Sequence, residues 1–181
     1  MKVYYSLDQE DYLQHQLYVC NTTPSIIKKR KANWFWLTFL FFAFAVIFFL
    51  LENKHLALFS FFMGLLVNLF YPMYERKKYF NYYNKYIKAH YPKKASDIAY
   101  IEFQSTYLLA NNPHSELKID YTAIEKIVEI KEYIFIRFNF TSSLIIPKKK
   151  IENLEEIKNY IIELSRKLNK EYSEELHWNW R

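Results

Sequence analysis

Two uninterrupted apolar runs, separated by four residues, constrain this chain more than any other feature. Residues 34–51 and residues 56–73 each contain eighteen residues without a charge. As α-helices, each run would be about 27 Å long, close to the hydrocarbon thickness of about 30 Å. The alternative is a pair of core helices, but a soluble chain of 181 residues has no second layer to cover two helices that are apolar all round. The runs therefore predict a two-helix transmembrane hairpin, residues 34–73.

Basic residues flank the outer ends of this hairpin, whereas the connecting loop holds one lysine beside one glutamate. They are Lys28, Lys29, Arg30 and Lys31 before the first helix, and Arg76, Lys77 and Lys78 after the second. The positive-inside rule then puts both outer flanks, and with them both termini, in the cytoplasm. We expect these basic residues to contact anionic lipid.

Aromatic residues favour the same orientation, because aromatic belts lie at membrane interfaces. The interface aromatics are Trp34 and Trp36 at the start of the first helix, and Tyr71 and Tyr74 at the end of the second. The sequence predicts an integral protein of the cytoplasmic membrane with two spans.

Three residues of the second run, Ser60, Gly64 and Asn68, are spaced by four and are expected on one helix face. Small residues let helices approach closely, and an Asn in hydrocarbon requires a polar partner. We interpret this stripe as the contact with the first helix of the same chain. A contact with a second copy of the chain is the alternative.

The segments beside the hairpin are expected to be cytoplasmic. Residues 1–33 predict a short strand at 3–5 and a helix at 8–20, followed by a break near Pro24. Residues 74–92 place tyrosines and lysines at helical spacing and predict a basic, aromatic connector helix. This connector either lies in the headgroup layer or packs on the domain that follows.

In residues 93–181 the apolar period changes to two. Six short strands are expected as an antiparallel meander, within residues 99–103, 107–110, 117–121, 126–131, 133–140 and 143–146. Asn153 and Glu156 then resemble a capping box, and an apolar stripe from Leu154 to Leu168 predicts a closing helix. The fold class is thus α+β, with a membrane hairpin and a small cytoplasmic antiparallel β domain closed by a C-terminal helix.

The order of these elements, together with the phrases IDYTAIEKIVEIKEYIFIRF and LIIPKKK, resembles the YcxB-like family of bacterial membrane proteins. The C-terminal part of that family is similar to bacterial pleckstrin-homology-like domains. The resemblance implies a pleckstrin-homology-like fold for residues 93–181 and a bacterial inner membrane location. Tyr121 stands where the family often has a tryptophan. The family carries no catalytic signature that would imply an activity.

The residues themselves give no constellation for catalysis. The only glycine is Gly64, so glycine-rich phosphate loops and nucleophile elbows are excluded. A single cysteine, Cys20, and five dispersed histidines do not offer the spacing of a zinc site. We expect a non-enzymatic protein without a cofactor or metal, and we expect no nucleic-acid partner because basic and acidic residues are interspersed.

Two further features carry open alternatives. Lys148, Lys149 and Lys150, together with Lys93 and Lys94, either face anionic lipid or lie in a solvated turn. The tail containing Trp178 and Trp180 either anchors at the membrane interface or covers the domain core.

The leading functional hypothesis is a membrane-anchored interaction module, in which a sheet edge or groove of the β domain binds another protein at the inner leaflet. The alternative is an accessory or pore-forming subunit that assembles with itself through the hairpin. The expected partners are therefore the lipid bilayer and either another protein or a second copy of the chain.

Overall fold

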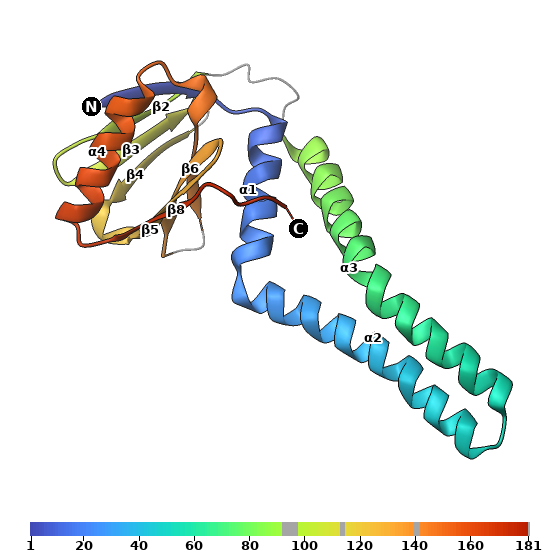
Figure 1. Cartoon of the computed structure of the whole chain (residues 1–181). Helices are drawn as coiled ribbons and strands as arrows, with labels where there is room; N and C mark the ends of the chain where they lie inside the picture. The colour runs from blue at the N-terminus through green and yellow to red at the C-terminus, as the bar shows by residue number, and fades with distance from the viewer. Residues whose placement is uncertain (92–97, 113–114, 140–141, 181) are drawn as a thin grey trace. The chain divides into compact units, whose positions relative to one another are not determined.

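The computed structural model of the chain describes residues 1–91, 98–112, 115–139 and 142–180 (Figure 1). The helices are α1 (Gln9–Thr22), α2 (Pro24–Leu50), α3 (Lys54–His90) and α4 (Leu154–Lys167). The strands are β1 (Lys2–Ser6), β2 (Ile98–Phe103), β3 (Tyr107–Asn112), β4 (Ser115–Asp120), β5 (Ile124–Ile130), β6 (Tyr133–Phe138), β7 (Ser143–Pro147) and β8 (Glu171–Glu175). Short 3₁₀ turns lie at Tyr121–Ala123 and Lys148–Lys150. The α+β class with two long apolar helices is confirmed.

The chain divides into two compact units, which we describe separately. The β unit comprises Met1–His15 and Tyr86–Asn179, and the hairpin unit comprises Gln16–Lys85 with Trp180. The sequence had suggested a separate N-terminal segment, residues 1–33, and a β domain starting at residue 93. Here β1 pairs with β2 from Lys2↔Glu102 to Ser6↔Ile98, so the N-terminal strand is part of the β unit. The predicted domain start, including Lys93 and Lys94, lies outside the described residues.

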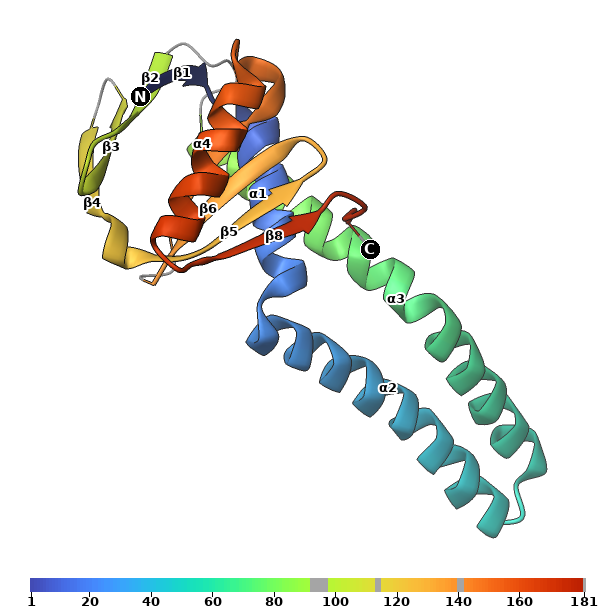
Figure 2. The ribbon, with the colours of Figure 1, turned by 60° about the vertical axis from the view of Figure 1, so that its left-hand side comes forward.

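The β unit contains two four-stranded sheets (Figure 2). The first has the order β1-β2-β3-β4 and is antiparallel throughout. The second has the order β7-β6-β5-β8, in which β8 runs parallel to β5. Strands β2 to β7 correspond to the six predicted strands, whereas β8 was not predicted.

One hydrophobic core joins both sheets and α4. The first sheet contributes residues such as Val3 and Ile101, the second contributes Ile127 and Ile136, and α4 contributes Ile161. All five are less than 4% exposed. In β2 the buried residues Ile101 and Phe103 follow the predicted period of two, whereas Leu117 of β4, which was predicted to face inward, is 48% exposed.

The second sheet is also covered on its outer face. The ring of Phe135 on β6 lies 5.2 Å from that of His15, and Tyr133 forms a hydrogen bond with the side chain of Asp11. His15 and Asp11 both belong to the first turns of α1. Burial on both faces explains why β6 reads YIFIRF, a nearly continuous apolar run.

The hairpin unit is formed mainly by α2 and α3, both long and apolar enough to cross a membrane. Leu51 ends α2 in a Schellman motif, in which Glu52 adopts a positive φ of 57° and the Asn53 N–H donates to the Phe48 carbonyl at 2.9 Å. The Asn53 side chain then accepts the N–H of Leu56 and caps α3. This turn produces the tight connection that the four-residue loop predicted.

The helix limits differ from the predicted ones. The helix α2 begins at Pro24 rather than at residue 34, because Thr23 alone is extended and Pro24 suits the first helical turn. The expected connector, residues 74–92, is not a separate helix: α3 continues from Lys54 to His90. The predicted capping box is also wrong, since the Asn153 side chain makes no capping hydrogen bond.

Candidate functional site

A buried ion pair joins α2 to α3 at the end of the hairpin remote from its turn. The Arg30 Nε donates a hydrogen bond to Glu75 Oε2 at 3.0 Å. The two side chains are only 13% and 9% exposed. A charge removed from water in this way is stable only beside an opposite charge, so each residue depends on the other.

Aromatic rings complete the surroundings of Arg30. Its guanidinium carbon lies 5.4 Å from the Tyr79 ring centre and 5.3 Å from that of Trp180. The indole of Trp180 is 9% exposed. Asn21 Oδ1 accepts a longer hydrogen bond from Arg30 Nη1 at 3.5 Å. Trp180 therefore covers buried charge in the hairpin unit and not the core of the β domain.

A pocket of about 250 Å³ opens beside this ion pair. Its lining is Asn21, Ile27, Arg30, Lys31, Trp34, Tyr71, Pro72 and Glu75. Because Glu75 neutralises Arg30, Lys31 supplies the unpaired positive charge at its mouth. An apolar wall beside one unpaired cation is suited to a small ligand that has both an anionic group and an apolar part.

Cys20 lies close to this cluster and is buried. Burial raises the pKa of its thiol, although Arg30 and a hydrogen bond with Tyr83 act in the opposite direction. A raised pKa leaves little thiolate at neutral pH, which is consistent with the inert thiol that a buried position implies.

The other basic residues flanking the hairpin that were predicted to contact lipid are exposed, unlike Arg30. Lys28, Lys29, Lys31, Arg76, Lys77 and Lys78 are exposed on α2 and α3. No ion pair involves any of them within the ranges that the structure describes. Their charges are thus available to solvent or to a charged surface.

The interface aromatics divide into two kinds. Trp36 and Tyr74 are 63% and 61% exposed and point away from the hairpin. Trp34, 37% exposed, and the half-buried Tyr71 line the pocket instead.

The three residues of the predicted helix contact differ in their surroundings. Ser60 is buried, and a Cβ added at Gly64 would lie 3.3 Å from the Phe41 Cβ and the Phe42 ring of α2. Asn68 is exposed and lies outside this contact. A strict spacing of four drifts about 40° per step around a helix of 3.6 residues per turn, so the contact line continues to Tyr71 and Glu75 instead.

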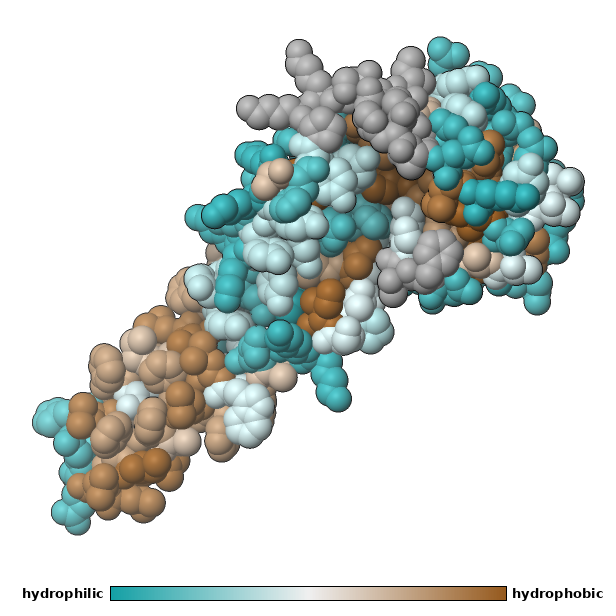
Figure 3. Space-filling view, turned by 180° about the vertical axis from the view of Figure 1, so that it is seen from behind, coloured by the Kyte–Doolittle hydropathy of each residue, from teal (hydrophilic) through white to brown (hydrophobic). Residues whose placement is uncertain are grey.

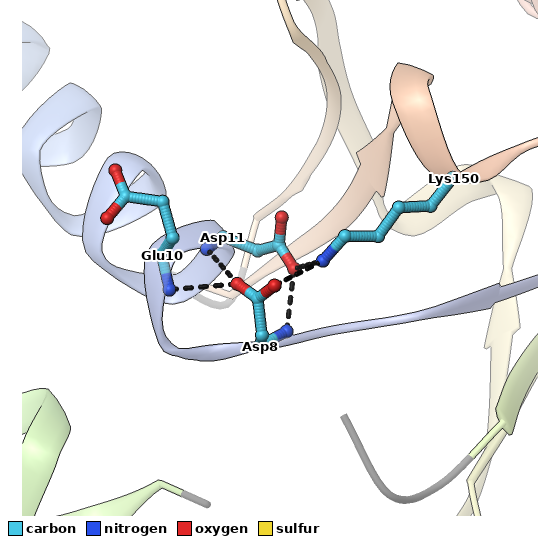
Figure 4. A network of polar contacts seen from close by, with 4 residues as sticks. All are labelled: Asp8, Glu10, Asp11 and Lys150. Carbon is cyan, nitrogen blue, oxygen red and sulfur yellow. Dashed lines mark hydrogen bonds and ion pairs between the residues drawn. The ribbon is translucent and has the colours of Figure 1, made fainter. Parts of the chain in front are cut away.

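The three consecutive lysines after β7 have partners inside the β unit. Lys150 Nζ binds both Asp8 and Asp11, at 2.7 and 2.5 Å (Figure 4). Asp8 Oδ1 also accepts the N–H groups of Glu10 and Asp11, while Asp11 Oδ2 accepts the N–H of Asp8, so the two aspartates cap α1 reciprocally. Burial opposes ionisation of Asp8, but the hydrogen bond and charge of Lys150, together with the backbone N–H groups of Asp11 and Glu10, outweigh it and lower the pKa of this carboxyl.

Lys148 and Lys149 are paired as well. Lys148 binds the buried carboxylate of Glu129 on β5, which Lys158 and Tyr172 also contact. Burial alone would raise the pKa of Glu129, but these three partners lower it. Lys149 pairs with the exposed Glu132. Of these three lysines, only Lys149 has an exposed ammonium that is available for contact with lipid.

Sequence reasoning missed Asp11, Glu75 and Glu129, the three buried acids of the described residues that bind basic side chains far away in sequence. Glu75 stands in the basic phrase YERKK, and its position one turn beyond Tyr71 on the contact face is the only local signal. Glu129 interrupts the apolar run IVEI, which is a recognisable signal of a buried charge with a partner.

Comparison with known proteins gives one match. The family model described as YcxB-like protein matches residues 103–161, from the end of β2 into α4. The predicted resemblance to this family is thereby confirmed. No curated protein and no solved structure matches the chain.

Proposed function

We propose that this YcxB-like chain is a non-enzymatic interaction module, anchored in the bacterial inner membrane by its hairpin and presenting its β unit in the cytoplasm. The apolar surface of the hairpin carries this proposal. Ala45 is the one buried residue of α2, and in the most apolar eighteen-residue window of α3 only 11% of the residues are buried. Side chains such as Phe49, Phe59 and Leu69 are more than 60% exposed.

Exposure on this scale has a simple physical consequence. At about 25 cal/mol per Å² of apolar surface, leaving two such helices in water is far less favourable than burying them in hydrocarbon. Figure 3 shows that the outer part of the hairpin is apolar on the face in view, with hydrophilic residues at its tip. Backbone groups are satisfied within the helices, as a bilayer requires.

The charges of the hairpin unit support cytoplasmic termini. Apart from Lys54, which Glu52 balances at the turn, the exposed lysines and arginines of the hairpin unit lie toward its open end. In the proposed orientation Trp36 and Tyr74 lie at headgroup level, and Lys28, Lys29, Lys31 and Arg76–Lys78 meet anionic lipid at about 1 kcal/mol each.

The β unit supports a pleckstrin-homology-like fold. Strands β1–β4 form one antiparallel sheet, β5–β7 form the antiparallel part of a second, and α4 closes the core between them. Such a unit is built to present edges and loops for binding, and its buried charges at Glu129 and Asp11 are fully engaged in structural pairs.

Labelling of cysteines in intact cells tests the membrane proposal. In a Cys20→Ser background, Asn53→Cys at the hairpin turn should react with an impermeant thiol reagent from outside. Lys131→Cys, on the exposed turn between β5 and β6, should react only after the cells are opened. Reaction of Lys131→Cys in intact cells would contradict the orientation, and extraction of the chain by carbonate would contradict insertion.

A second function is favoured by Asn68. This amide faces outward from the apolar part of the hairpin, where hydrocarbon offers it no hydrogen-bond partner. A matching Asn68 of another copy would supply one, which supports an oligomeric accessory or pore-forming subunit. If the chain oligomerises, copies that carry Leu69→Cys should form an intermolecular disulfide, and adding Asn68→Leu should abolish it. No disulfide with either Asn68 or Leu at position 68 would exclude this function.

A further inference from the structure

We propose that the free edge of β1 and the first turns of α4 form a groove that binds an extended, basic segment of a partner protein as an added β-strand. This inference rests on the proposed interaction function and locates its binding face. It is carried by three observations on the β unit: hydrogen-bonding groups directed away from the sheet, a groove beside them, and unpaired carboxylates on the groove rim.

The first observation concerns the backbone of β1, which stands at the end of the order β1-β2-β3-β4. Met1 and Phe103 exchange both of their backbone hydrogen bonds, at 2.8 and 3.2 Å. Hydrogen-bonded pairs alternate along an antiparallel ladder, so Val3↔Ile101 is the next bonded pair. The N–H and C=O groups of Lys2 and Tyr4 therefore point away from β2.

These outward groups are not used elsewhere in the part of the chain that the structure describes. The backbone hydrogen bonds outside the regular elements do not involve Lys2 or Tyr4. The strand is straight, with continuous register and no proline. Natural sheets commonly protect a free edge with a charge, proline or bulge. The one charge, Lys2, lies over the face of the Tyr100 ring at 3.7 Å.

The second observation is a groove of about 700 Å³ beside this edge. Its apolar lining includes Val3 of β1 and Ile157 of α4, with Ile151 between them. The size falls within the range of about 300–1,000 Å³ for small-molecule pockets. An edge strand facing a helix across an apolar floor is the geometry in which peptides add to a sheet, with main-chain bonds on one side and side-chain pockets on the other.

The third observation is the charge of the rim. Glu152 and Glu156 are exposed, line the groove and form no ion pair with any described residue. The basic residue beside them, Lys150, is already bound to Asp8 and Asp11. Lys2 also lines the groove on the β1 side, where its ammonium lies over the Tyr4 and Tyr100 rings at 5.2 and 3.7 Å. The unpaired charge on the α4 side of the groove is thus acidic, and a partner segment complements it with Lys or Arg.

The test uses the full chain in a mild detergent and a phage-displayed library of random nonapeptides as the probe. Selected peptides, made synthetically with a fluorescent label, are titrated by anisotropy. We expect Lys or Arg at a recurring position, and protection of the Tyr4 amide from hydrogen exchange when the peptide is bound.

Two matched pairs of variants test the edge and the rim separately. Tyr4→Pro removes an outward N–H without touching the bonds to β2 and should abolish binding, whereas Tyr4→Val keeps the N–H and should bind. Glu156→Lys should weaken binding about tenfold or more. Glu155→Lys, a neighbouring exposed residue outside the groove lining, should change it less than about twofold.

Several results would overturn the proposal. They are the absence of selected peptides, peptides without a basic residue, and binding that Tyr4→Pro and Glu156→Lys both leave unchanged. A change of oligomeric state in these variants, without peptide binding by the wild type, would assign the edge to a second copy instead. Flotation with phospholipid vesicles distinguishes failure of the peptide-binding proposal from failure of the membrane proposal. A chain that floats with the vesicles but binds no peptide contradicts only the binding groove. A chain that binds peptide but does not float contradicts only the membrane anchor.

Discussion

Arg30 and Glu75, which are 45 residues apart in sequence, meet at 3.0 Å and join the two long helices at the open end of the hairpin. The helices are already joined at their other end by the turn at Glu52 and Asn53. The ion pair therefore closes the hairpin at both ends. Of the seven basic flanking residues that were expected to contact lipid, Arg30 therefore has a structural role.

Removing one partner of this pair should destabilise the hairpin unit. Glu75→Gln leaves the Arg30 guanidinium largely buried without a counter-charge, and we expect a loss of about 3 kcal/mol in the free energy of unfolding. Lys29→Gln, at an exposed neighbouring position, should cost less than about 0.5 kcal/mol. Thermal unfolding of the full chain in a mild detergent measures both. Equal melting temperatures for the two variants would show that the pair is not structural.

The two long apolar helices and most strands could be predicted because their signals are local. Eighteen apolar residues in sequence predict a long apolar helix without knowledge of the rest of the chain, and alternation in residues such as Ala99, Ile101 and Phe103 predicts a half-buried strand. The Glu75–Arg30 pair has no such signal, because it depends on how two helices align over 45 residues.

The strand β8 shows a second kind of limit. Its sequence EYSEE is acidic and has no apolar alternation, so period and propensity both argue against a strand. It forms because β5 offers a free edge, where Tyr172 pairs with Ile127 and its hydroxyl reaches Glu129 at 2.5 Å. A strand made by tertiary pairing cannot be read from its own residues.

The contact at Gly64 should not tolerate a large side chain. Alanine requires Phe41 and Phe42 of α2 to move by a few tenths of an ångström, so we expect Gly64→Ala to fold with a change of about 1 kcal/mol or less. Leucine does not fit at this distance and should separate the helices. Leu66→Phe, on the exposed side of α3, serves as the control.

A cysteine pair tests the packing of α3 on α2 directly. Phe41→Cys and Gly64→Cys in a Cys20→Ser background should form an intramolecular disulfide, since their positions are in van der Waals contact. With Leu66→Phe added, the disulfide should still form. Failure of the pair to crosslink would contradict the observed packing of α3 on α2.

The two lysines that follow each other in the turn after β7 should differ greatly in importance. Lys150→Gln leaves the buried carboxylate of Asp11 without its cation, and we expect a loss of about 2 kcal/mol. Lys149→Gln breaks only an exposed pair with Glu132 and should cost less than about 0.5 kcal/mol. Chemical unfolding at neutral pH compares them. Similar losses for the two variants would show that the Asp8–Asp11–Lys150 network contributes no more than a surface pair.

His15 should make the β unit less stable in mild acid. Burial, and then the positive charge of Arg137, lower the pKa of its imidazole to about 4, and its Nε2 has no hydrogen-bond partner among the described residues. An unfolded histidine titrates near 6.5. Between pH 6.5 and 4 the unfolded chain therefore binds a proton that the folded chain does not, so the free energy of unfolding falls as the pH is lowered through this window and levels off below it.

The full effect of this shift would be about 3 kcal/mol, and the exposed part of the ring reduces it. His15→Leu removes the titrating group and should flatten the pH dependence between 6.5 and 4. The Asp8 and Glu129 carboxyls, whose pKa values are lowered in the folded chain, also stabilise it, and because unfolded carboxyls titrate near 4 this contribution is fully present above about pH 5 and is lost below it, in the wild type and the variant alike. Urea unfolding of both proteins at several pH values separates the two ranges, and an unchanged slope between pH 6.5 and 4 in His15→Leu would assign the acid sensitivity to another group.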